Sequence, residues 1–253
     1  MKFVIIGGTG LIGSKLVARL KEQGHEAVPA APNTGVNTLT GEGLAEVLKG
    51  ASVVVDVSNS PSFEEKAVMD FFTTSARNLL KYAAAAKVRH LVALSVVGCE
   101  RILDSPYLRA KHAQETVIKG GAIPYSIVQA TQFFEFVNRI ADEATDGTTV
   151  RLPPVLIQPM AADEVVAAVA RTALGAPLNG TVEVAGPQAF RFDELIRLNL
   201  AARHDAREVV ADRHARYFGA ELGERSLVPA TRDPRLGEIR YQAWLDQAAL
   251  QHR

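Results

Sequence analysis

A glycine-rich loop near the N-terminus constrains the fold of this chain more than any other feature of its sequence. The loop runs from Gly7 to Gly13 and satisfies both the GxxGxxG and the GxGxxG spacing. A continuous apolar run, residues 3–6, precedes it, and apolar residues at helical spacing follow it over residues 11–23. A strand, a glycine turn and a helix N-terminus in this order are typical of a unit that binds the pyrophosphate of a dinucleotide.

Each glycine of this loop has a physical role. The first permits a tight turn, the middle one lets the backbone approach the pyrophosphate, and the last lets the helix pack closely on the strand. The helix N-terminus adds free N–H groups and the positive end of its dipole. We therefore expect cofactor contacts from Gly7, Thr9, Gly10, Leu11 and Ile12.

Strand and helix patterns alternate to about residue 142, which predicts an α/β fold with a doubly wound parallel (Rossmann) sheet. Further strands are expected at residues 26–30, 52–57, 88–94 and 125–129, and helices at 62–86, 106–119 and 132–141. Later patterns predict strands at 155–159 and 182–185, a helix over 164–174 capped by Asp163, and a helix over 192–200. We expect a dinucleotide-binding core in residues 1–150 and a smaller C-terminal substrate lobe in residues 151–253, packed on the same core as one unit.

Composition limits the function classes. Lys plus Arg and Asp plus Glu each total 28, so no net charge attracts nucleic acid or an anionic membrane. The single cysteine, Cys99, cannot form an intramolecular disulfide, which fits a reducing compartment. The first apolar run ends at Gly7, too soon for a signal peptide, and no apolar stretch reaches the roughly 18 residues of a membrane span. We expect a cytoplasmic protein with no nucleic-acid or membrane partner; the sequence indicates no oligomeric state.

A tyrosine and a lysine suggest chemistry. Tyr107 and Lys111 stand at i and i+4 of an expected helix and share one face. An ammonium group near a phenol lowers the pKa of tyrosine from about 10, and such a tyrosine can exchange a proton with a carbonyl oxygen. Ser95 lies one short loop upstream at the carboxyl end of a strand, where its hydroxyl could hold the substrate oxygen. A surface Tyr–Lys pair without chemistry is the alternative.

The segment after the second strand bears on cofactor choice. Residues 28–35 contain neither an acid, which would bind the ribose of NAD, nor an arginine. Because no carboxylate repels a 2′-phosphate, and because Asn33 and Thr34 can donate hydrogen bonds to one, the segment favours NADP(H) over NAD(H). A loop that does not discriminate is the alternative.

Three phenylalanines follow the fifth expected strand. Phe133, Phe134 and Phe136 could line a substrate pocket, although core packing explains each of them equally well. His90 and His112 have no partners at ligand spacing, so we expect no metal site.

Taken together, the glycine loop, Ser95, Tyr107 and Lys111 resemble the short-chain dehydrogenase/reductase superfamily. The stretches LVALSVVG (91–98), YLRAKHAQE (107–115), IPYSIVQATQFF (123–134) and AADEVVAAV (161–169) are similar to its atypical, NmrA-like branch. The resemblance extends over residues 1–200 and implies a Ser–Tyr–Lys site with hydride transfer at C4 of a nicotinamide.

The resemblance also implies cofactor contacts beyond the glycine loop. Ser58, Asn59 and Ser60 match the loop that touches the cofactor's ribose, and Asn37 matches a polar position near the adenine. This chain departs from the branch at two places. It lacks the basic residue that many relatives carry after the second strand, and it has Gln129-Ala130 where an Arg-Pro is common.

The leading hypothesis is an NADP(H)-dependent oxidoreductase that acts on a small to mid-sized carbonyl or alcohol. In it Tyr107 is the acid/base, Lys111 tunes it and holds ribose, and Ser95 orients the carbonyl. Some members of the branch lack the tyrosine and sense redox state, so a noncatalytic NAD(P)-sensing regulator is the alternative. An isomerase or dehydratase that uses bound NAD transiently is a third reading.

Overall fold

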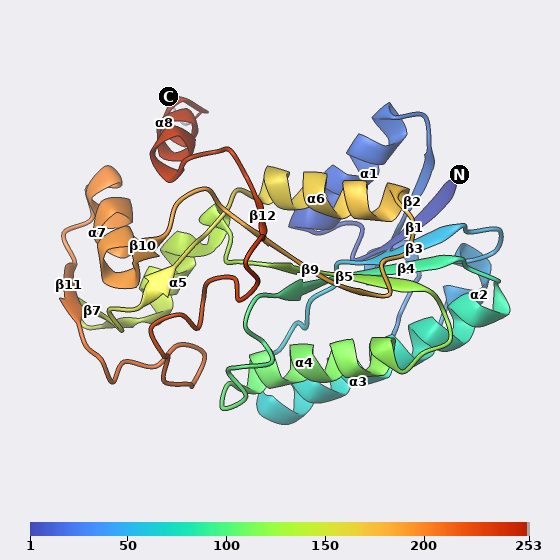
Figure 1. Cartoon of the computed structure of the whole chain (residues 1–253), viewed down its shortest axis with the longest axis horizontal. Coiled ribbons are helices and arrows are strands. Elements are labelled where there is room, and N and C mark those ends of the chain that lie inside the picture. The colour runs from blue at the N-terminus through green and yellow to red at the C-terminus, as the bar shows by residue number, and fades with distance from the viewer. Residues whose placement is uncertain (252–253) are drawn as a thin grey trace.

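The computed structural model describes residues 1–251 and contains a seven-stranded sheet between two layers of helices (Figure 1). Every strand pair in this sheet is parallel, and the order is β2-β1-β3-β4-β5-β9-β12. The strands are β1 (Lys2–Ile6), β2 (Glu26–Ala30), β3 (Val53–Asp56), β4 (His90–Val96), β5 (Tyr125–Ala130), β9 (Gly180–Ala185) and β12 (Arg235–Leu236). The predicted doubly wound parallel sheet is confirmed.

Helices cover both faces of the sheet. One layer consists of α1 (Leu11–Glu22) and α6 (Ala162–Leu174); the other consists of α2 (Leu44–Val47), α3 (Glu65–Ala85) and α4 (Pro106–Lys119) (Figure 1). The first strand shows why its sequence is continuously apolar. Phe3 and Ile5 join the core under the first layer, whereas Val4 and Ile6 join the core under the second.

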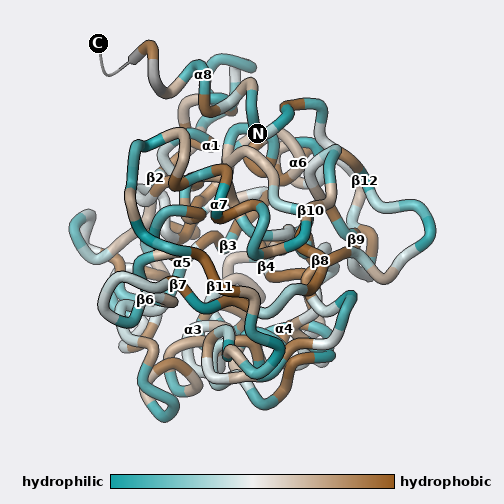
Figure 2. Tube along the Cα trace, turned by 90° about the vertical axis from the view of Figure 1, so that its left-hand side faces the viewer, coloured by the Kyte–Doolittle hydropathy of each residue, from teal (hydrophilic) through white to brown (hydrophobic). Residues whose placement is uncertain are grey.

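A smaller lobe lies at one end of the sheet, on the left of Figure 1. Its helical segments are η2 (Phe134–Phe136), α5 (Val137–Glu143), α7 (Phe192–Ala202) and α8 (Tyr241–Gln251). Its strands are β6 (Thr145–Asp146), β7 (Thr149–Leu152), β8 (Leu156–Ile157), β10 (Phe190–Arg191) and β11 (Glu208–Ala211). Figure 2 looks onto this lobe and shows apolar chain around β8 and β11 among more hydrophilic loops. The apolar side chains of the lobe pack in one cluster with Cys99, Ile102 and Leu108, which lie after β4 and on α4.

The chain passes between sheet and lobe several times. It leaves the sheet after β5, builds α5 and β7 in the lobe, and returns through α6 and β9. It then forms α7 and β11 in the lobe and contributes β12 to the sheet before ending in α8. Residues after 150 are thus divided between the two parts.

Two expected elements have different boundaries. Ala161, not Asp163, is the N-cap of α6, because the carboxylate of Glu135 accepts hydrogen bonds from the backbone N–H of Ala162. Asp163 lies in the first turn and pairs with Lys15 of α1 at 2.6 Å. The helix expected over 132–141 begins as the 3₁₀ turn η2 and becomes α-helical only at Val137. Within residues 1–251, no helix combines the length and apolarity needed to cross a membrane.

Candidate active site

The glycine loop is held by two close approaches of backbone. Gly7 has φ +77°, a left-handed conformation that side chains disfavour. A Cβ on Gly13 would lie 2.1 Å from the carbonyl oxygen of Gly7, so only glycine lets α1 pack this closely on the turn. Gly10 is the N-cap of α1; no side chain caps this end and its first turn holds no acid. The first N–H groups of α1 are therefore oriented to bind an anion.

A cavity of about 550 Å³ lies along the carboxyl ends of the strands. Nine residues expected to bind the cofactor line it: Gly7, Thr9, Gly10, Leu11, Ile12, Asn37, Ser58, Asn59 and Lys111. Its lining includes Pro32, which lies near the expected adenine position Asn37 in the sequence, and Tyr107, the expected catalytic residue. We refer to it as the cofactor cavity. A long cleft that begins at a bare helix N-terminus and a glycine turn fits a dinucleotide.

Three expected cofactor residues do not line this cavity, and two of them use their hydroxyls locally. The Thr34 hydroxyl accepts from Ala31 N at 2.8 Å and can donate to Ala31 O in the 3₁₀ turn η1 (Pro32–Thr34). The Ser60 hydroxyl donates to the carbonyl of Ser62. Asn33 accepts a hydrogen bond from the Thr9 hydroxyl through its side-chain oxygen, which leaves its NH₂ group as a donor.

Lys111 is buried on α4 at the edge of the cofactor cavity. Its Nζ donates to Leu94 O at 2.9 Å and to Gln114 Oε1 at 2.5 Å, and lies 4.4 Å from the centre of the Phe72 ring. Burial lowers the pKa of this lysine, and the charge of Asp56 opposes that shift.

A chain of hydrogen bonds connects Lys111 to the end of β3. Gln114 Nε2 donates to Asp56 Oδ2 at 3.0 Å, and Asp56 Oδ1 accepts from both the backbone N–H and the hydroxyl of Ser58. Asp56 ends β3, so its carboxylate connects the loop after that strand to α4. The sequence left the role of Asp56 open.

Tyr107 differs from the sequence-based expectation. Burial raises its pKa, and the nearby Cys99 adds to the rise, whereas an approaching ammonium was expected to lower it. The reason is geometric, because the Lys111 ammonium is directed at Leu94 and Gln114. The ring of Tyr107 packs against Phe63 and Phe218, each with a centroid 5.4 Å away. The phenol therefore keeps its proton at neutral pH.

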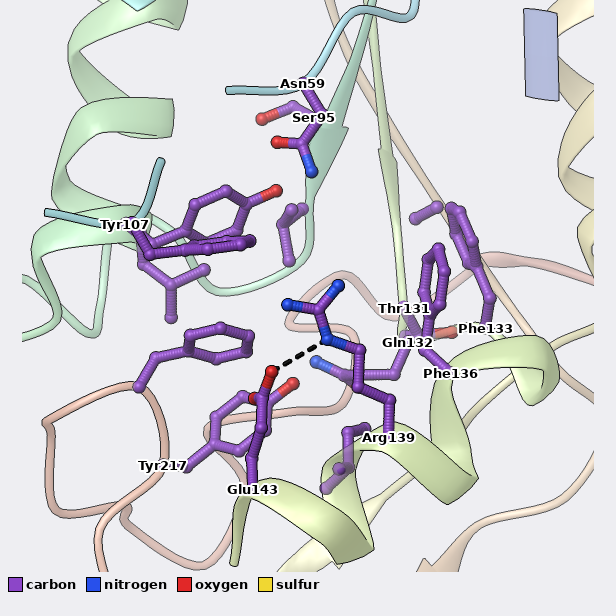
Figure 3. A pocket seen from close by; sticks show the side chains of 16 residues that line it. Asn59, Ser95, Tyr107, Thr131, Gln132, Phe133, Phe136, Arg139, Glu143 and Tyr217 are labelled. Carbon is purple, nitrogen blue, oxygen red and sulfur yellow. Dashed lines mark hydrogen bonds and ion pairs between the residues drawn. The ribbon is translucent and has the colours of Figure 1, made fainter. Parts of the chain in front are cut away.

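A second cavity of about 150 Å³ adjoins the first, and we refer to it as the substrate cavity. Asn59, Ser95, Tyr107, Phe133 and Phe136 line both cavities. Figure 3 shows Tyr107 close to Asn59 and Ser95, with Phe133 and Phe136 on the opposite side. The two cavities thus meet at the expected Ser and Tyr.

Most other residues that line the substrate cavity were not predicted from the sequence: Phe63, Thr131, Gln132, Arg139, Glu143, Tyr217 and Phe218. The spacing of Phe136, Arg139 and Glu143 over 3₁₀ and α turns could have revealed one shared face. Tyr217 and Phe218 lie in the polar tail, where no periodic pattern is visible.

Phe134 requires a correction. It was expected beside Phe133 as a substrate residue, yet it lines neither cavity. Its side chain is 2% exposed and packs in the lobe core, 5.0 Å from the ring of Tyr241 and 5.6 Å from Trp244. Successive residues around η2 point in different directions, so Phe134 enters the core while Phe133 and Phe136 face the cavities.

Behind Ser95 lies a buried polar cluster. Gln129 Nε2 donates to Glu115 Oε1 at 2.8 Å, Lys119 pairs with Glu115 Oε2 at 3.0 Å, and the thiol of Cys99 lies 3.3 Å from Oε1. Hydrogen bonds from Ser95, Gln129 and Lys119 outweigh burial and lower the pKa of Glu115. This carboxylate stays ionised inside the fold.

His112 adjoins this cluster. Ligand atoms of Cys99, His112 and Glu115 lie within 4.8 Å of one another, a proximity that the sequence spacing did not show. Both oxygens of Glu115 also accept hydrogen bonds, from Gln129 and Lys119.

Sequence comparison agrees with this geometry. A family model described as NAD(P)H-binding matches residues 7–177, from the first glycine of the loop to beyond α6. The chain belongs to the NAD(P)H-binding family. Two curated relatives match this NAD(P)H-binding chain over about half of their own length. The photosystem II assembly factor Ycf39 of Cyanophora paradoxa is 24% identical over 59% of this chain and 51% of its own.

The second relative, a (4-alkanoyl-5-oxo-2,5-dihydrofuran-3-yl)methyl phosphate reductase of Streptomyces griseus subsp. griseus, is 26% identical over 51% of this chain and 47% of its own.

Solved structures share the fold of this chain. A short-chain dehydrogenase/reductase superfamily protein from Agrobacterium tumefaciens with bound NAD superposes with a TM-score of 0.73 at 17% identity, covering 100% of this chain and 97% of its own. A dTDP-4-dehydrorhamnose reductase from Bacillus anthracis in complex with NADP gives 0.70 at 12% identity, covering 100% and 99%. The chain therefore shares its fold with one protein solved with NAD and with another solved with NADP.

Proposed function

We propose that this protein is an NADP(H)-dependent reductase of the NmrA-like branch that acts on a small carbonyl compound in the cytoplasm. The observation that supports it most directly is the meeting of the two cavities at Tyr107 and Ser95. A substrate in the smaller cavity and a dinucleotide in the larger one share these side chains.

Tyr107 supplies a proton in the reducing direction. A reduced nicotinamide, when bound, supplies the hydride. Tyr107 holds its proton at neutral pH, so it can protonate the carbonyl oxygen. Lys111 presents its remaining N–H to the cofactor's ribose. Ser95 orients the carbonyl once its hydroxyl turns from Glu115 to the substrate oxygen.

NADP(H) is the preferred cofactor in this proposal. The 3₁₀ turn after β2 carries no carboxylate that would repel a 2′-phosphate, and Asn33 retains its NH₂ group as a donor. Thr34 contributes less than the sequence suggests, because its hydroxyl is occupied by Ala31.

The decisive experiment is Tyr107→Phe, with Tyr125→Phe on β5 as the matched control, since Tyr125 lines neither cavity. The first variant should lose 10²–10⁴-fold in the oxidation of NADPH by a carbonyl substrate while its affinity for NADPH stays within about twofold. The control should retain both. Full turnover in Tyr107→Phe would overturn the proposal.

A noncatalytic NAD(P)-sensing regulator is the second candidate, favoured by a relative that is named as an assembly factor. Such a protein binds the dinucleotide but turns over no carbonyl, so Tyr107→Phe would change neither property. An isomerase or dehydratase is distinguished by the absence of net NADPH oxidation while substrate is converted.

A further inference from the structure

The substrate cavity is a slot between aromatic walls. On one side Phe63, Tyr107 and Phe218 form a triangle with ring centroids 5.4–5.7 Å apart. On the other side Phe133 and Phe136 stack at 5.5 Å with an interplanar angle of 24° (Figure 3). The Arg139 guanidinium lies between these walls, with its carbon 5.5 Å from the centre of the Phe63 ring (Figure 3). Aromatic side chains together with a planar guanidinium favour a flat conjugated ligand.

One wall is held in an uncommon backbone conformation. Phe218 has φ +46°, in the left-handed region that bulky residues avoid, and Gly219 follows at φ +83°. Phe218 stacks on Tyr107 at an interplanar angle of 29°. Backbone strain of this kind is found at ligand-binding positions, where surrounding contacts maintain it.

The volume limits the ligand to about one ring. The cavity measures about 150 Å³, and a protein cavity of about 150 Å³ accommodates benzene. A disaccharide, a nucleotide or a polycyclic compound exceeds this space.

Two buried polar groups in the wall lack partners. Thr131 is 1% and Gln132 8% exposed, and within the described chain neither Thr131 Oγ1 nor Gln132 Oε1 has a hydrogen-bond partner. Leaving such an acceptor unsatisfied costs about 1–3 kcal/mol. Both side chains line the substrate cavity and neither lines the cofactor cavity, so a hydroxyl on the substrate is a suitable partner.

The slot carries no net charge. Arg139 and Glu143 are the charged residues that line it within residues 1–251, and they pair with each other at 2.8 Å. A carboxylate or diphosphate would need to compete with Glu143 for the guanidinium.

Resting on the proposed function, we infer that the substrate is an uncharged, single-ring aromatic aldehyde or ketone that carries a hydroxyl group. The ring lies against the aromatic walls beside the Arg139 guanidinium, the carbonyl faces Tyr107 and Ser95, and the hydroxyl meets Thr131 and Gln132. During reduction the carbonyl carbon gains the hydride and its oxygen gains the Tyr107 proton, which yields an alcohol. The oxidised nicotinamide leaves, and solvent reprotonates the tyrosinate.

The test compares three probes with NADPH: 3-hydroxybenzaldehyde, benzaldehyde and 3-carboxybenzaldehyde. We expect kcat/KM for the hydroxylated probe to exceed that for benzaldehyde about tenfold, the value of one good hydrogen bond, and the anionic probe to be poorest. In Thr131→Val and Gln132→Leu the tenfold ratio should fall toward one. Circular dichroism melting confirms that each variant is folded.

Calorimetry separates this inference from the proposed function. Binding of each probe is measured to the protein saturated with NADP⁺, which requires no turnover. The same rank order in binding without any turnover would support the substrate class and overturn the reductase. Turnover of charged or aliphatic carbonyls in preference to 3-hydroxybenzaldehyde would overturn the substrate class and leave the reductase intact.

Glu143→Gln supplies a gain of function. Removing the carboxylate frees the Arg139 guanidinium, so the affinity for 3-carboxybenzaldehyde relative to that for benzaldehyde should rise about tenfold. An unchanged affinity ratio would contradict the neutral slot.

Discussion

The two cavities differ in how the chain builds them. The cofactor cavity rests mainly on backbone at the ends of neighbouring parallel strands and on one helix N-terminus, all within the first 111 residues apart from two phenylalanines. The substrate cavity consists of side chains from segments as far apart as Phe63 and Phe218. The two cavities differ in how far apart in the sequence their lining residues lie. A local motif determines the cofactor cavity, whereas tertiary packing determines the substrate cavity.

The largest expected effect is a loss of stability that tests whether Phe134 serves the lobe core and Phe136 the substrate cavity. Phe134→Ala should cost about 3–5 kcal/mol of unfolding free energy, because it empties a buried aromatic site in the lobe. Phe136→Ala, at a residue 42% exposed, should leave the melting temperature nearly unchanged and raise the KM for an aromatic aldehyde. Thermal melts and steady-state kinetics measure both; equal losses of stability would contradict the assignment.

The second prediction concerns the cofactor cavity. Gly13→Ala places a methyl group 2.1 Å from the Gly7 carbonyl, so the turn must shift and NADPH affinity should fall more than about tenfold. Gly120→Ala, where the nearest atom lies at 3.5 Å, is the control. Fluorescence titration of NADPH reads out both variants, and equal affinities would show that the loop does not depend on this close packing.

A smaller effect would resolve cofactor choice. Asn33→Asp introduces a carboxylate beside the expected 2′-phosphate, so KM for NADPH should rise about tenfold relative to KM for NADH. Asn33→Ala controls for loss of the donor alone and should shift the ratio less. A ratio that is unchanged in Asn33→Asp would place the ribose elsewhere.

The smallest effect is a pH dependence. Lys111 carries its charge below its pKa and loses it above, and burial lowers that pKa, whereas burial raises the pKa of Tyr107. Reduction should therefore decline on the alkaline side as Lys111 loses its proton, before Tyr107 does. Lys111→Arg should move this decline to higher pH, because arginine stays charged. A decline that does not move in Lys111→Arg would assign it to another group.

Sequence patterns predicted the central strands well because these are apolar on both faces, as in β1, and because each glycine acts within its own turn. They did not predict β12, whose two residues are exposed. They also predicted that Ser95 and Tyr107 lie at the same site, because Ser95 ends a strand and Tyr107 lies on one face of the next helix. They failed where distant residues decide. Glu135 caps α6 from another segment, Lys111 is directed away from the tyrosine by Gln114, and Tyr217 reaches the cavity from an unpatterned tail.

The repeated passage of the chain between sheet and lobe affects how this protein can be re-engineered. Because β9 and β12 are interleaved with α7 and β11, no single cut separates a dinucleotide half from a specificity half. In a chimera joined at residue 150, the strands β9 and β12 and the covering helix α6 would come from the other parent protein. Its sheet would therefore combine strands of two proteins. Selectivity is better altered by point replacement within α5 and the segment around Phe218 than by module exchange.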